Sequence, residues 1–202
     1  MKYAIICGSH RKNSESLNVG DYLKHQIEKN GKDDVYILDL GSSNIPLWEE
    51  SIWEGDTKWA EIWGGHSEKL SECEAIIIIT PEWNGMVTPT LKNFFLLCSK
   101  GELAHKPGFI VSISSGRGGT YPVSELRMSS YKNTYLCYIP DHIIIRHVTE
   151  FFNDFEKSES EEEKYLRDRI DYSLSILKEY AKGMNIVRES QKIDLQAYPY
   201  GM

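Results

Sequence analysis

The sequence predicts an α/β fold, a doubly wound five-stranded parallel sheet with helices on both faces. Three observations lead to this fold class. Strand-like apolar runs alternate with helix-like stripes along the chain, and no two strands follow each other directly. Residues 75–80 form a continuous β-branched run, as a central parallel strand covered on both faces requires. At 202 residues, the chain is long enough for one domain with a large core.

The expected strands are short apolar runs bounded by turn residues. They cover residues 2–7, 35–40, 75–80, 108–114 and 143–147. The helices between them are expected to start at Leu17, Trp59, Pro89 and Pro122, and to end near residues 30, 73, 98 and 136. A last, long helix is expected to open at Ser160, which forms a capping-box pattern with Glu163. We interpret the acidic run 156–163 as a solvated linker and helix start.

We expect residues 1–183 to form a single domain and residues 184–202 to form a C-terminal tail. The formal net charge of −7 argues against a nucleic-acid partner, because phosphate backbones select basic surfaces. No apolar run has the length of a membrane span and the N-terminus shows no signal-peptide pattern, so we expect a cytoplasmic protein without a membrane partner. The four cysteines are widely spaced, so we expect neither a disulfide framework nor a metal site.

Ligands of doubly wound sheets bind beyond the carboxyl ends of the strands, so the loops there are the places to examine. The first loop combines a turn glycine, polar side chains, two basic residues and the start of a helix: Gly8, Ser9, Arg11, Lys12, Asn13, Ser14 and Ser16. Helix N-termini and arginine side chains both bind phosphate. The alternative is that the serines only cap the helix and the basic side chains are solvated. The whole set favours a phosphate site.

The loops after the third and fourth expected strands are also unusual. In residues 80–89, two prolines, a glycine and Asn84 fix a rigid path, and Trp83 offers a face for a flat heterocycle. An ordinary turn with a packing tryptophan is the alternative. Residues 114–122 contain three glycines within four positions, which allow a ligand to approach the backbone closely. A flexible connection would show the same composition.

Together these residues resemble the NADPH-dependent FMN reductases, a family of flavodoxin-like quinone, azo-dye and flavin reductases. The family pattern G-S-x-R-x-x-S is matched by residues 8–14, and its P-E-[YW]-N-G motif by residues 81–85. The family's P-x-x-L-K-N helix start is approximated by P-T-L-K-N at residues 89–93, one position shorter, and its G-x-G-G loop is loosely matched at residues 116–119. The resemblance covers residues 2–147.

This resemblance implies an NAD(P)H oxidoreductase that binds FMN, uses NADPH or NADH, and passes electrons to a small acceptor such as a quinone, azo compound, flavin or metal ion. It places the FMN phosphate at Ser9, Arg11, Ser14 and Ser16, and it adds Leu17 to the residues that bind the cofactor. It places the ribityl chain and isoalloxazine ring beside Pro81, Glu82, Trp83, Asn84 and Gly85. The other edge of the ring would face Ser115, Gly116, Arg117, Gly118 and Gly119.

The resemblance also implies a homodimer or homotetramer. No side-chain acid or base is nominated, because the chemistry belongs to the flavin, and Glu82 is interpreted as structural. The aromatic segment 48–63 is a candidate contact surface or active-site wall. A flavodoxin-type electron carrier and a non-enzymatic flavin-binding or partner-binding module remain alternatives. A serine hydrolase is disfavoured because G-x-S-x-G is absent.

Overall fold

The sheet is the predicted five-stranded parallel one. The computed structural model describes residues 1–158 and 160–198. Its strands are β1 (Lys2–Cys7), β2 (Asp34–Asp39), β3 (Ala75–Pro81), β4 (Pro107–Ile113) and β5 (Cys137–Ile145). They pair in parallel in the order β2-β1-β3-β4-β5. From β1 the chain runs to β2 on one side and then crosses to β3 on the other side of β1. The topological switch point therefore lies between β1 and β3.

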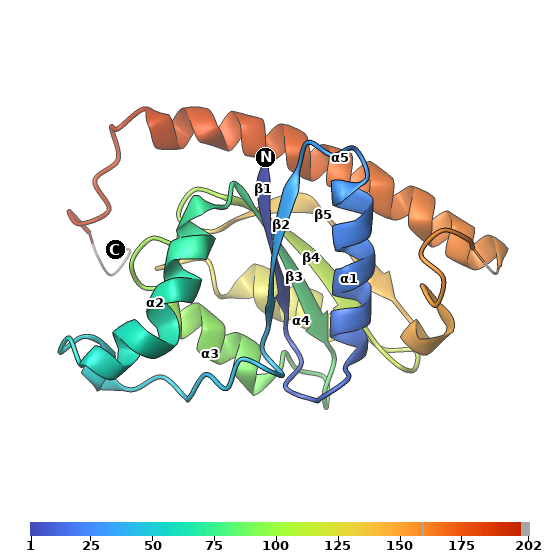
Figure 1. The fold of residues 1–202 in the computed structure, drawn as a ribbon, viewed down its shortest axis with the longest axis horizontal. Coiled ribbons are helices and arrows are strands. Elements are labelled where there is room, and N and C mark those ends of the chain that lie inside the picture. Colours follow the sequence, from blue (N-terminus) through green and yellow to red (C-terminus); the bar gives the residue numbers. More distant parts are fainter. Residues whose placement is uncertain (159, 199–202) are drawn as a thin grey trace.

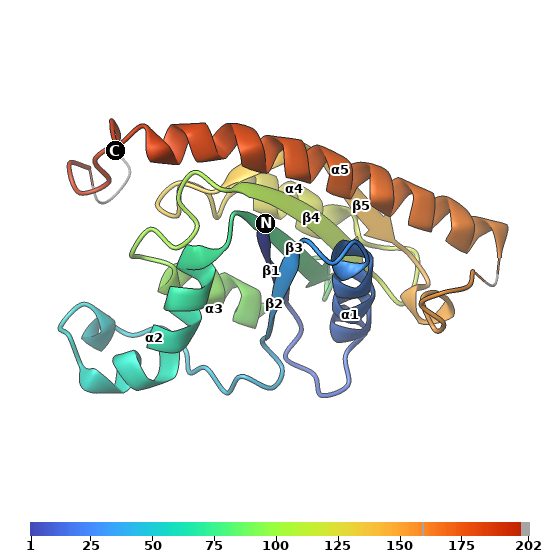
Figure 2. The ribbon, with the colours of Figure 1, turned by 45° about the horizontal axis from the view of Figure 1, so that its top comes forward.

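Helices cover both faces of the sheet, as Figure 1 and Figure 2 show. One face carries α1 (Glu15–Glu28) and α5 (Glu161–Glu189), and the other carries α2 (Thr57–Glu72), α3 (Pro89–Leu97) and α4 (Thr120–Met128). Two short 3₁₀ helices, η1 (Glu50–Ile52) and η2 (Val148–Glu150), lie in the connections. No helix within the described residues is both long and apolar enough to cross a membrane.

The central strand shows why the sequence folds this way. Every residue of β3 is buried. Ile77 and Ile79 belong to the core shared with α1 and α5, whereas Ile76 and Ile78 belong to the core shared with α2, α3 and α4. Successive strand side chains point to opposite faces, so a strand covered on both faces must be apolar at every position.

Local capping fixes where the helices begin. Thr88 accepts a hydrogen bond from the backbone N–H of Leu91, and Pro89 occupies the first helical position of α3. The side chain of Ser160 accepts from the backbone N–H of Glu163 at 3.1 Å, as the expected capping box requires. Because α3 begins at Pro89, shortly after β3 ends at Pro81, its N-terminus lies at the carboxyl end of the sheet.

Two expected elements differ from the structure. The helix expected to end at residue 136 stops at Met128, where the hydroxyls of Ser129 and Ser130 donate to the carbonyls of Glu125 and Leu126. Such side-chain bonds compete with the helical ladder, and Ser130 takes a left-handed φ of 67°. The last strand begins at residue 137 instead of 143, and its register shifts between residues 108 and 110 of β4.

The C-terminal region is also more integrated than expected. Helix α5 crosses the expected domain end at residue 183 and continues to Glu189. Beyond residue 183, Asn185 donates to Glu74 at 2.8 Å and Arg188 donates to the carbonyl of His105 at 2.7 Å. Residues 199–202 of the expected tail lie outside the described residues. The acidic run is not wholly solvated either, since Glu163 is buried.

Candidate active site

The first loop leaves β1 at a point of very close packing. A β-carbon on Gly8 would lie 2.6 Å from the carbonyl oxygen of Ile79 and 2.9 Å from Leu91, so only glycine fits there. The N–H of Gly8 donates to the carbonyl of Ile79 at 2.8 Å, and the hydroxyl of Thr88 donates to the carbonyl of Gly8. These contacts fasten the start of the first loop to β3 and to the N-terminus of α3.

The serines of the first loop differ in their hydrogen bonding: some have a partner in the loop or helix, and one has none among the described residues. Ser14 is the N-cap of α1 and accepts from the backbone N–H of Leu17 at 3.3 Å, so the capping alternative holds for this residue. Ser9 accepts from the N–H of Arg11 at 3.2 Å, and the Arg11 side chain is exposed. The hydroxyl of Ser16 is buried and has no hydrogen-bond partner among the described residues. A buried hydroxyl without a partner is costly unless a ligand satisfies it.

The second loop is a tight turn at the end of β3. Trp83 and Met86 exchange backbone hydrogen bonds of 3.1 and 2.9 Å around Asn84 and Gly85, whose φ angles are 49° and 71°. Asn-Gly with positive φ at both central positions is the preferred type I′ hairpin turn. The Trp83 ring meets His10 of the first loop edge-to-face, with 4.5 Å between ring centroids. The turn thus places Trp83 against the phosphate-binding candidate loop.

Glu82 joins the second loop to the third. Its carboxylate accepts from the backbone N–H of Gly119 at 2.6 Å. Gly119 is the N-cap of α4 with a φ of 109°, and a β-carbon there would lie 2.5 Å from Ile144. A β-carbon on Gly118 would lie 2.7 Å from Glu82 itself. These contacts support the structural role expected for Glu82, and they explain two of the three loop glycines by packing.

A cavity of about 330 Å³ lies between these loops at the carboxyl edge of the sheet. Eight of the expected site residues line it: Ser9, Arg11, Ser14, Ser16, Pro81, Glu82, Trp83 and Ser115. The remaining expected residues do not line it, namely Leu17, Asn84, Gly85, Gly116, Arg117, Gly118 and Gly119. Its volume is at the lower end of small-molecule sites, which span roughly 300–1,000 Å³.

The cavity also has a wall that the sequence did not reveal. Asn13 and Ser114 of the first and third loops complete its lining, and so do four residues that the sequence did not indicate, namely Glu15, Ile113, Val148 and Thr149. The last two belong to the segment after β5, and Val148 donates its backbone N–H to the carbonyl of Ser114 at 3.1 Å. No motif marks this segment. Only the pairing of β5 with β4 brings it to the site, so the β-strand order was the missing information.

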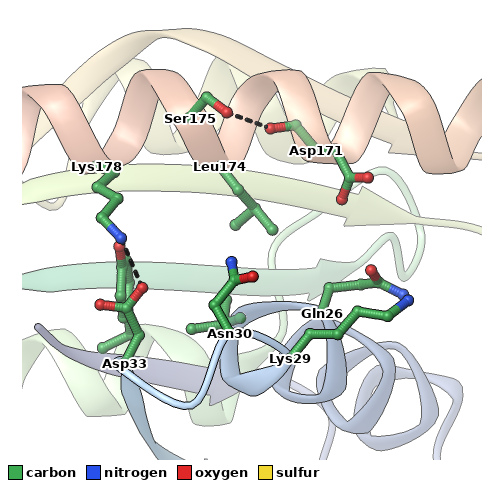
Figure 3. A pocket seen from close by; sticks show the side chains of 10 residues that line it. Gln26, Lys29, Asn30, Asp33, Asp171, Leu174, Ser175 and Lys178 are labelled. Atoms are coloured by element: carbon green, nitrogen blue, oxygen red, sulfur yellow. Dashed lines mark hydrogen bonds and ion pairs between the residues drawn. The ribbon is translucent and has the colours of Figure 1, made fainter.

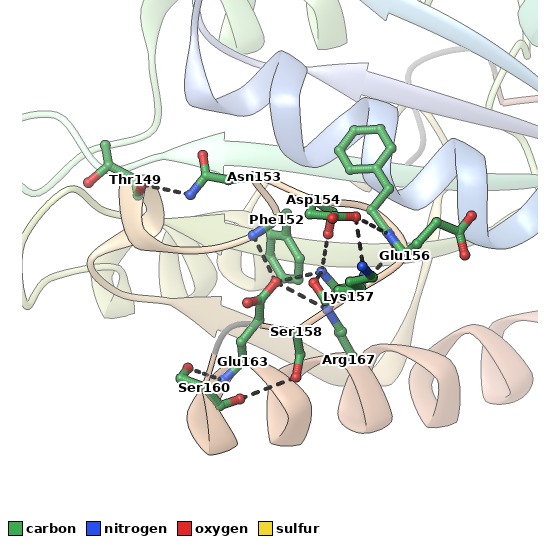
Figure 4. A network of polar contacts seen from close by, with 11 residues as sticks. Thr149, Phe152, Asn153, Asp154, Glu156, Lys157, Ser158, Ser160, Glu163 and Arg167 are labelled. Atoms are coloured by element: carbon green, nitrogen blue, oxygen red, sulfur yellow. Dashed lines mark hydrogen bonds and ion pairs between the residues drawn. The ribbon is translucent and has the colours of Figure 1, made fainter.

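Figure 4 shows how this wall is anchored. The buried carboxylate of Glu163 accepts from the N–H of Phe152 at 3.1 Å and pairs with Arg167 at 2.6 Å. The Arg167 guanidinium donates to three carbonyls of the segment, those of residues 154, 155 and 157. It also lies over the ring of Tyr22, which stacks on Phe152. Helices α1 and α5 therefore fix the segment that carries Val148 and Thr149.

A second cavity, of about 300 Å³, lies at the opposite, amino-terminal edge of the sheet (Figure 3). Asp33 there accepts from the N-terminal amine at 3.1 Å and from Lys178 at 2.7 Å. Burial alone would raise the pKa of Asp33, but these two cations hold that pKa below its ordinary value. Burial raises the pKa of nearby Asp171.

The aromatic segment 48–63 does not form a wall of the candidate active site. Trp59 and Trp63 are buried in the core beneath α2. Trp48 and the exposed Trp53 meet edge-to-face and line a separate cavity of about 780 Å³ beside α3. Of the two roles expected for this segment, only the contact surface remains a prediction.

The carboxyl-edge cavity fits a phosphate-bearing ligand. It combines a helix N-terminus, a buried unpartnered hydroxyl on Ser16 and the exposed guanidinium of Arg11, and all three recognise anions. Trp83 supplies an aromatic wall close by. A parallel sheet of order 2-1-3-4-5 with such a loop at its switch point defines a doubly wound nucleotide-binding protein of the flavodoxin-like class.

Comparison with known proteins identifies the family. The model of the NADPH-dependent FMN reductases matches residues 1–150, and the chain belongs to that family. It is therefore an NAD(P)H-dependent oxidoreductase with FMN as its cofactor.

Individual relatives are distant. The chain is 23% identical to an NADPH azoreductase of Bacillus sp. (strain OY1-2), over 72% of this chain and 76% of that protein. It is 30% identical to a quinone reductase of Pseudomonas putida, over 58% of this chain and 62% of that protein. The structure of FerB, a flavoenzyme NAD(P)H:acceptor oxidoreductase of Paracoccus denitrificans, superposes with a TM-score of 0.72 at 19% identity, covering 89% and 98% of the two chains. That likeness shows the shared fold.

Proposed function

We propose that this protein catalyses two-electron reduction of a small aromatic acceptor, such as a quinone or an azo compound, at the expense of NAD(P)H. The observation that carries the proposal is the open third loop. A β-carbon on Gly116 would meet no atom within 4 Å, unlike those on Gly118 and Gly119. The side chain of Tyr121 is 68% exposed, and its ring lies next to Gly85 of the second loop. A planar molecule thus has access beside the cavity. Free flavin is a further acceptor of this aromatic class, and metal ions remain a separate candidate acceptor.

The relatives support the acceptor class. One is named for the reduction of azo compounds and another for the reduction of quinones. Both kinds of acceptor are flat and apolar over much of their surface. Exposed Met86, in the turn that carries Trp83, and exposed Tyr121, next to Gly85 of that turn, provide apolar and aromatic surface of that kind beside the cavity.

The residues of the chain would bind and orient, because bound FMN itself supplies the two-electron chemistry. Ser16, Arg11 and the N-terminus of α1 would hold the phosphate. The 83–86 turn, rigid at Asn84 and Gly85, would fix the edge of the ring through its backbone. Glu82 would hold the third loop at a fixed distance from that turn through Gly119. In the net reaction, NADPH and one proton convert the quinone to its hydroquinone and leave NADP⁺.

A stopped-flow experiment without oxygen tests the proposal. The FMN-loaded protein is mixed with NADPH, and the flavin absorbance near its visible maximum is followed. We expect rapid loss of colour, its return when a quinone is added, and parallel reciprocal plots in steady state, since the two half-reactions share one site. Absent or very slow bleaching by both NADPH and NADH, with bound FMN present, would favour the electron-carrier alternative and overturn the enzymatic one.

We also propose that the protein forms a homodimer, or a homotetramer built from it, through the surface of α3 and α4. A cavity of about 280 Å³ between these helices is lined by Val87, Phe95, Leu96 and Leu126. Leu96 and Met128 are 58% and 78% exposed there, so a second copy would bury apolar surface that water now covers. Light scattering after chromatography should show a dimer that Leu96→Asp converts to a monomer. A monomeric parent protein would contradict this.

We also propose a cytoplasmic location. Fractionation of cells that express the tagged chain tests it, and recovery with the membrane or secreted fraction would contradict it.

A further inference from the structure

The third loop and the segment after β5 form one joined surface at the mouth of the cavity. Ser114 donates its N–H to the carbonyl of Ile145 at 2.9 Å, and Val148 donates to the carbonyl of Ser114 at 3.1 Å. His147 donates to the carbonyl of Gly116 at 3.0 Å. Three backbone hydrogen bonds therefore fix the two segments relative to each other. Side chains at neighbouring positions of the two segments are held close together.

Two arginines extend from this surface. The Nε of Arg146 donates to the carbonyl of Arg117 at 2.8 Å, so the Arg146 guanidinium lies against the backbone that carries Arg117. Both side chains are exposed. Neither pairs with a carboxylate in residues 1–158 and 160–198. The bond from Nε leaves the two terminal nitrogens of Arg146 pointing away from its stem and available to a ligand.

The charge of the surroundings makes this pair conspicuous. The chain has a formal net charge of −7, and the cavity lining contains one arginine, Arg11, against the carboxylates of Glu15 and Glu82. A second anionic group would therefore be repelled by the cavity itself. Arg117 follows the lining residue Ser115 by two positions, and Arg146 precedes the lining residue Val148 by two. The pair thus offers positive charge directly outside the site.

We propose that Arg117 and Arg146 bind the 2′-phosphate of NADPH and make the enzyme prefer NADPH over NADH; this rests on the proposed function. A phosphate monoester carries close to two negative charges at neutral pH and three terminal oxygens, which two forked guanidinium groups match. The pyrophosphate common to both dinucleotides carries one charge on each phosphate and matches a pair of arginines less well. Discrimination then arises because NADH leaves both guanidinium groups without a partner.

Binding of nucleotide fragments tests the proposal without turnover. The FMN-loaded protein is titrated in a calorimeter with 2′-phospho-ADP-ribose and with ADP-ribose, which differ only in the 2′-phosphate. We expect the 2′-phosphorylated fragment to bind at least about tenfold more tightly, and Arg117→Ala or Arg146→Ala each to remove about tenfold of that advantage, as one charge-assisted contact predicts. The advantage should shrink as ionic strength rises, because the groups are exposed.

Matched variants keep the result interpretable. Within residues 1–158 and 160–198 the Arg117 side chain makes no hydrogen bond that holds the loop, so Arg117→Ala should leave the melting temperature unchanged even if Arg146→Ala loosens the segment. Arg117→Lys retains the charge but not the fork, and it should recover part of the preference. Lys132→Ala removes an equal charge from the loop before β5, at the other edge of the sheet, and should change neither affinity.

Steady-state kinetics then distinguishes the 2′-phosphate assignment from the proposed reductase function. We expect Arg117→Ala to raise KM for NADPH about tenfold and to leave KM for NADH unchanged. Equal weakening of both dinucleotides, or a parent protein that binds the two fragments equally, would overturn the 2′-phosphate assignment while leaving the reductase intact. A retained preference for the 2′-phosphorylated fragment without flavin reduction by either dinucleotide would instead overturn the proposed function and leave the anion site standing.

Discussion

The two edges of the sheet carry cavities of similar size and opposite character. The amino-terminal cavity holds about 300 Å³ and the carboxyl-edge cavity about 330 Å³. At the amino-terminal edge, Asp33 is bonded to both the N-terminal amine and Lys178. At the carboxyl edge, the hydroxyl of Ser16 is buried without a partner among the described residues, and Arg11 forms no ion pair there either.

Volume therefore does not distinguish the two cavities, whereas the unpartnered hydroxyl of Ser16 does. Folding alone accounts for the charges at the amino-terminal edge, because each one stabilises the connection between elements. It does not account for a hydroxyl buried at a helix N-terminus with nothing to bond. The difference predicts that changes at one edge alter stability and leave flavin binding alone, and that changes at the other do the reverse.

The largest effect is expected from Gly85→Val at the carboxyl edge. Gly85 has a φ of 71°, which costs a β-branched residue roughly 1–3 kcal/mol of backbone strain. We expect the turn to shift and FMN affinity to fall by roughly a hundredfold, about 2.7 kcal/mol, in a protein that still folds. Fluorescence titration of the flavin-free protein measures this. Gly85→Asn, which tolerates positive φ, is the matched control. Full FMN occupancy in Gly85→Val would remove this turn from the site.

Arg11→Ala should follow in size. Loss of one charge-assisted contact to the phosphate should cost about 1.5–3 kcal/mol of FMN affinity. Riboflavin lacks the phosphate, so its affinity should stay the same, and titrations with both flavins give the comparison directly. Lys12→Ala, beside it in the same exposed loop, controls for the loss of charge. An equal loss for FMN and riboflavin would place Arg11 away from the phosphate.

The reverse pattern is expected from Asp33→Asn at the amino-terminal edge. Breaking the pairs with Lys178 and the N-terminal amine should lower the free energy of unfolding at pH 7 by roughly 1–2 kcal/mol. FMN affinity should stay constant. Denaturant unfolding and flavin titration on the same samples test both statements, and the neighbouring exposed Asp34→Asn is the control. A loss of FMN affinity as large as that of Arg11→Ala would break the comparison.

The same carboxylate gives a pH dependence with a definite sign. Because the pKa of Asp33 is lower in the folded protein than its ordinary value of 3.8, its stabilising contribution is complete above about pH 4. It is lost as pH falls through the lowered pKa. The stability difference between the parent protein and Asp33→Asn should therefore be constant from pH 5 to 7 and shrink in stronger acid. A stability difference between the two proteins that grows as the pH falls would contradict the ion pairs of Asp33.

The smallest effect is expected from Ser16→Ala, and its sign is the informative part. FMN affinity should fall by about 0.5–1.5 kcal/mol. The flavin-free protein should be no less stable, and up to about 1 kcal/mol more stable, because a buried hydroxyl without a partner is removed. Ser14→Ala should instead destabilise the flavin-free protein by about 1 kcal/mol, since Ser14 caps α1. Thermal unfolding with and without FMN distinguishes them. Equal destabilisation by both would assign Ser16 a structural role.

Much of the fold could be predicted because its signals are local. The continuous burial of β3 appears directly as a β-branched run, and the Thr88-Pro89 start of α3 is a property of two adjacent residues. The end of α4 could not be predicted, because it depends on the hydroxyls of Ser129 and Ser130 turning back onto helix carbonyls. The early start of β5 depends on pairing with β4 across a register shift, which is a tertiary fact.

The residues of the site also divide into those that local sequence predicts and those that it does not. Residues of the first and second loops could be found because their spacing within the chain is fixed by the turn and the helix start. Val148 and Thr149 could not, because nothing in their own sequence sets them beside Ser114. Two glycines expected to face the ring also serve packing, Gly118 against Glu82 and Gly119 against Ile144. A glycine-rich loop indicates that another group lies close to the backbone, and the structure identifies that group.

The Arg167 and Glu163 cluster has a consequence for how the molecule fluctuates. Residues 151–158 contain no helix or strand, yet the three carbonyls bonded to Arg167 and the N–H of Phe152 are tied to α5. Such a segment opens only when the helix that holds it also opens. Its amide hydrogens should exchange with deuterium at rates closer to those of α5 than to those of an ordinary surface loop, and trypsin should spare the bond after Lys157 in the native protein.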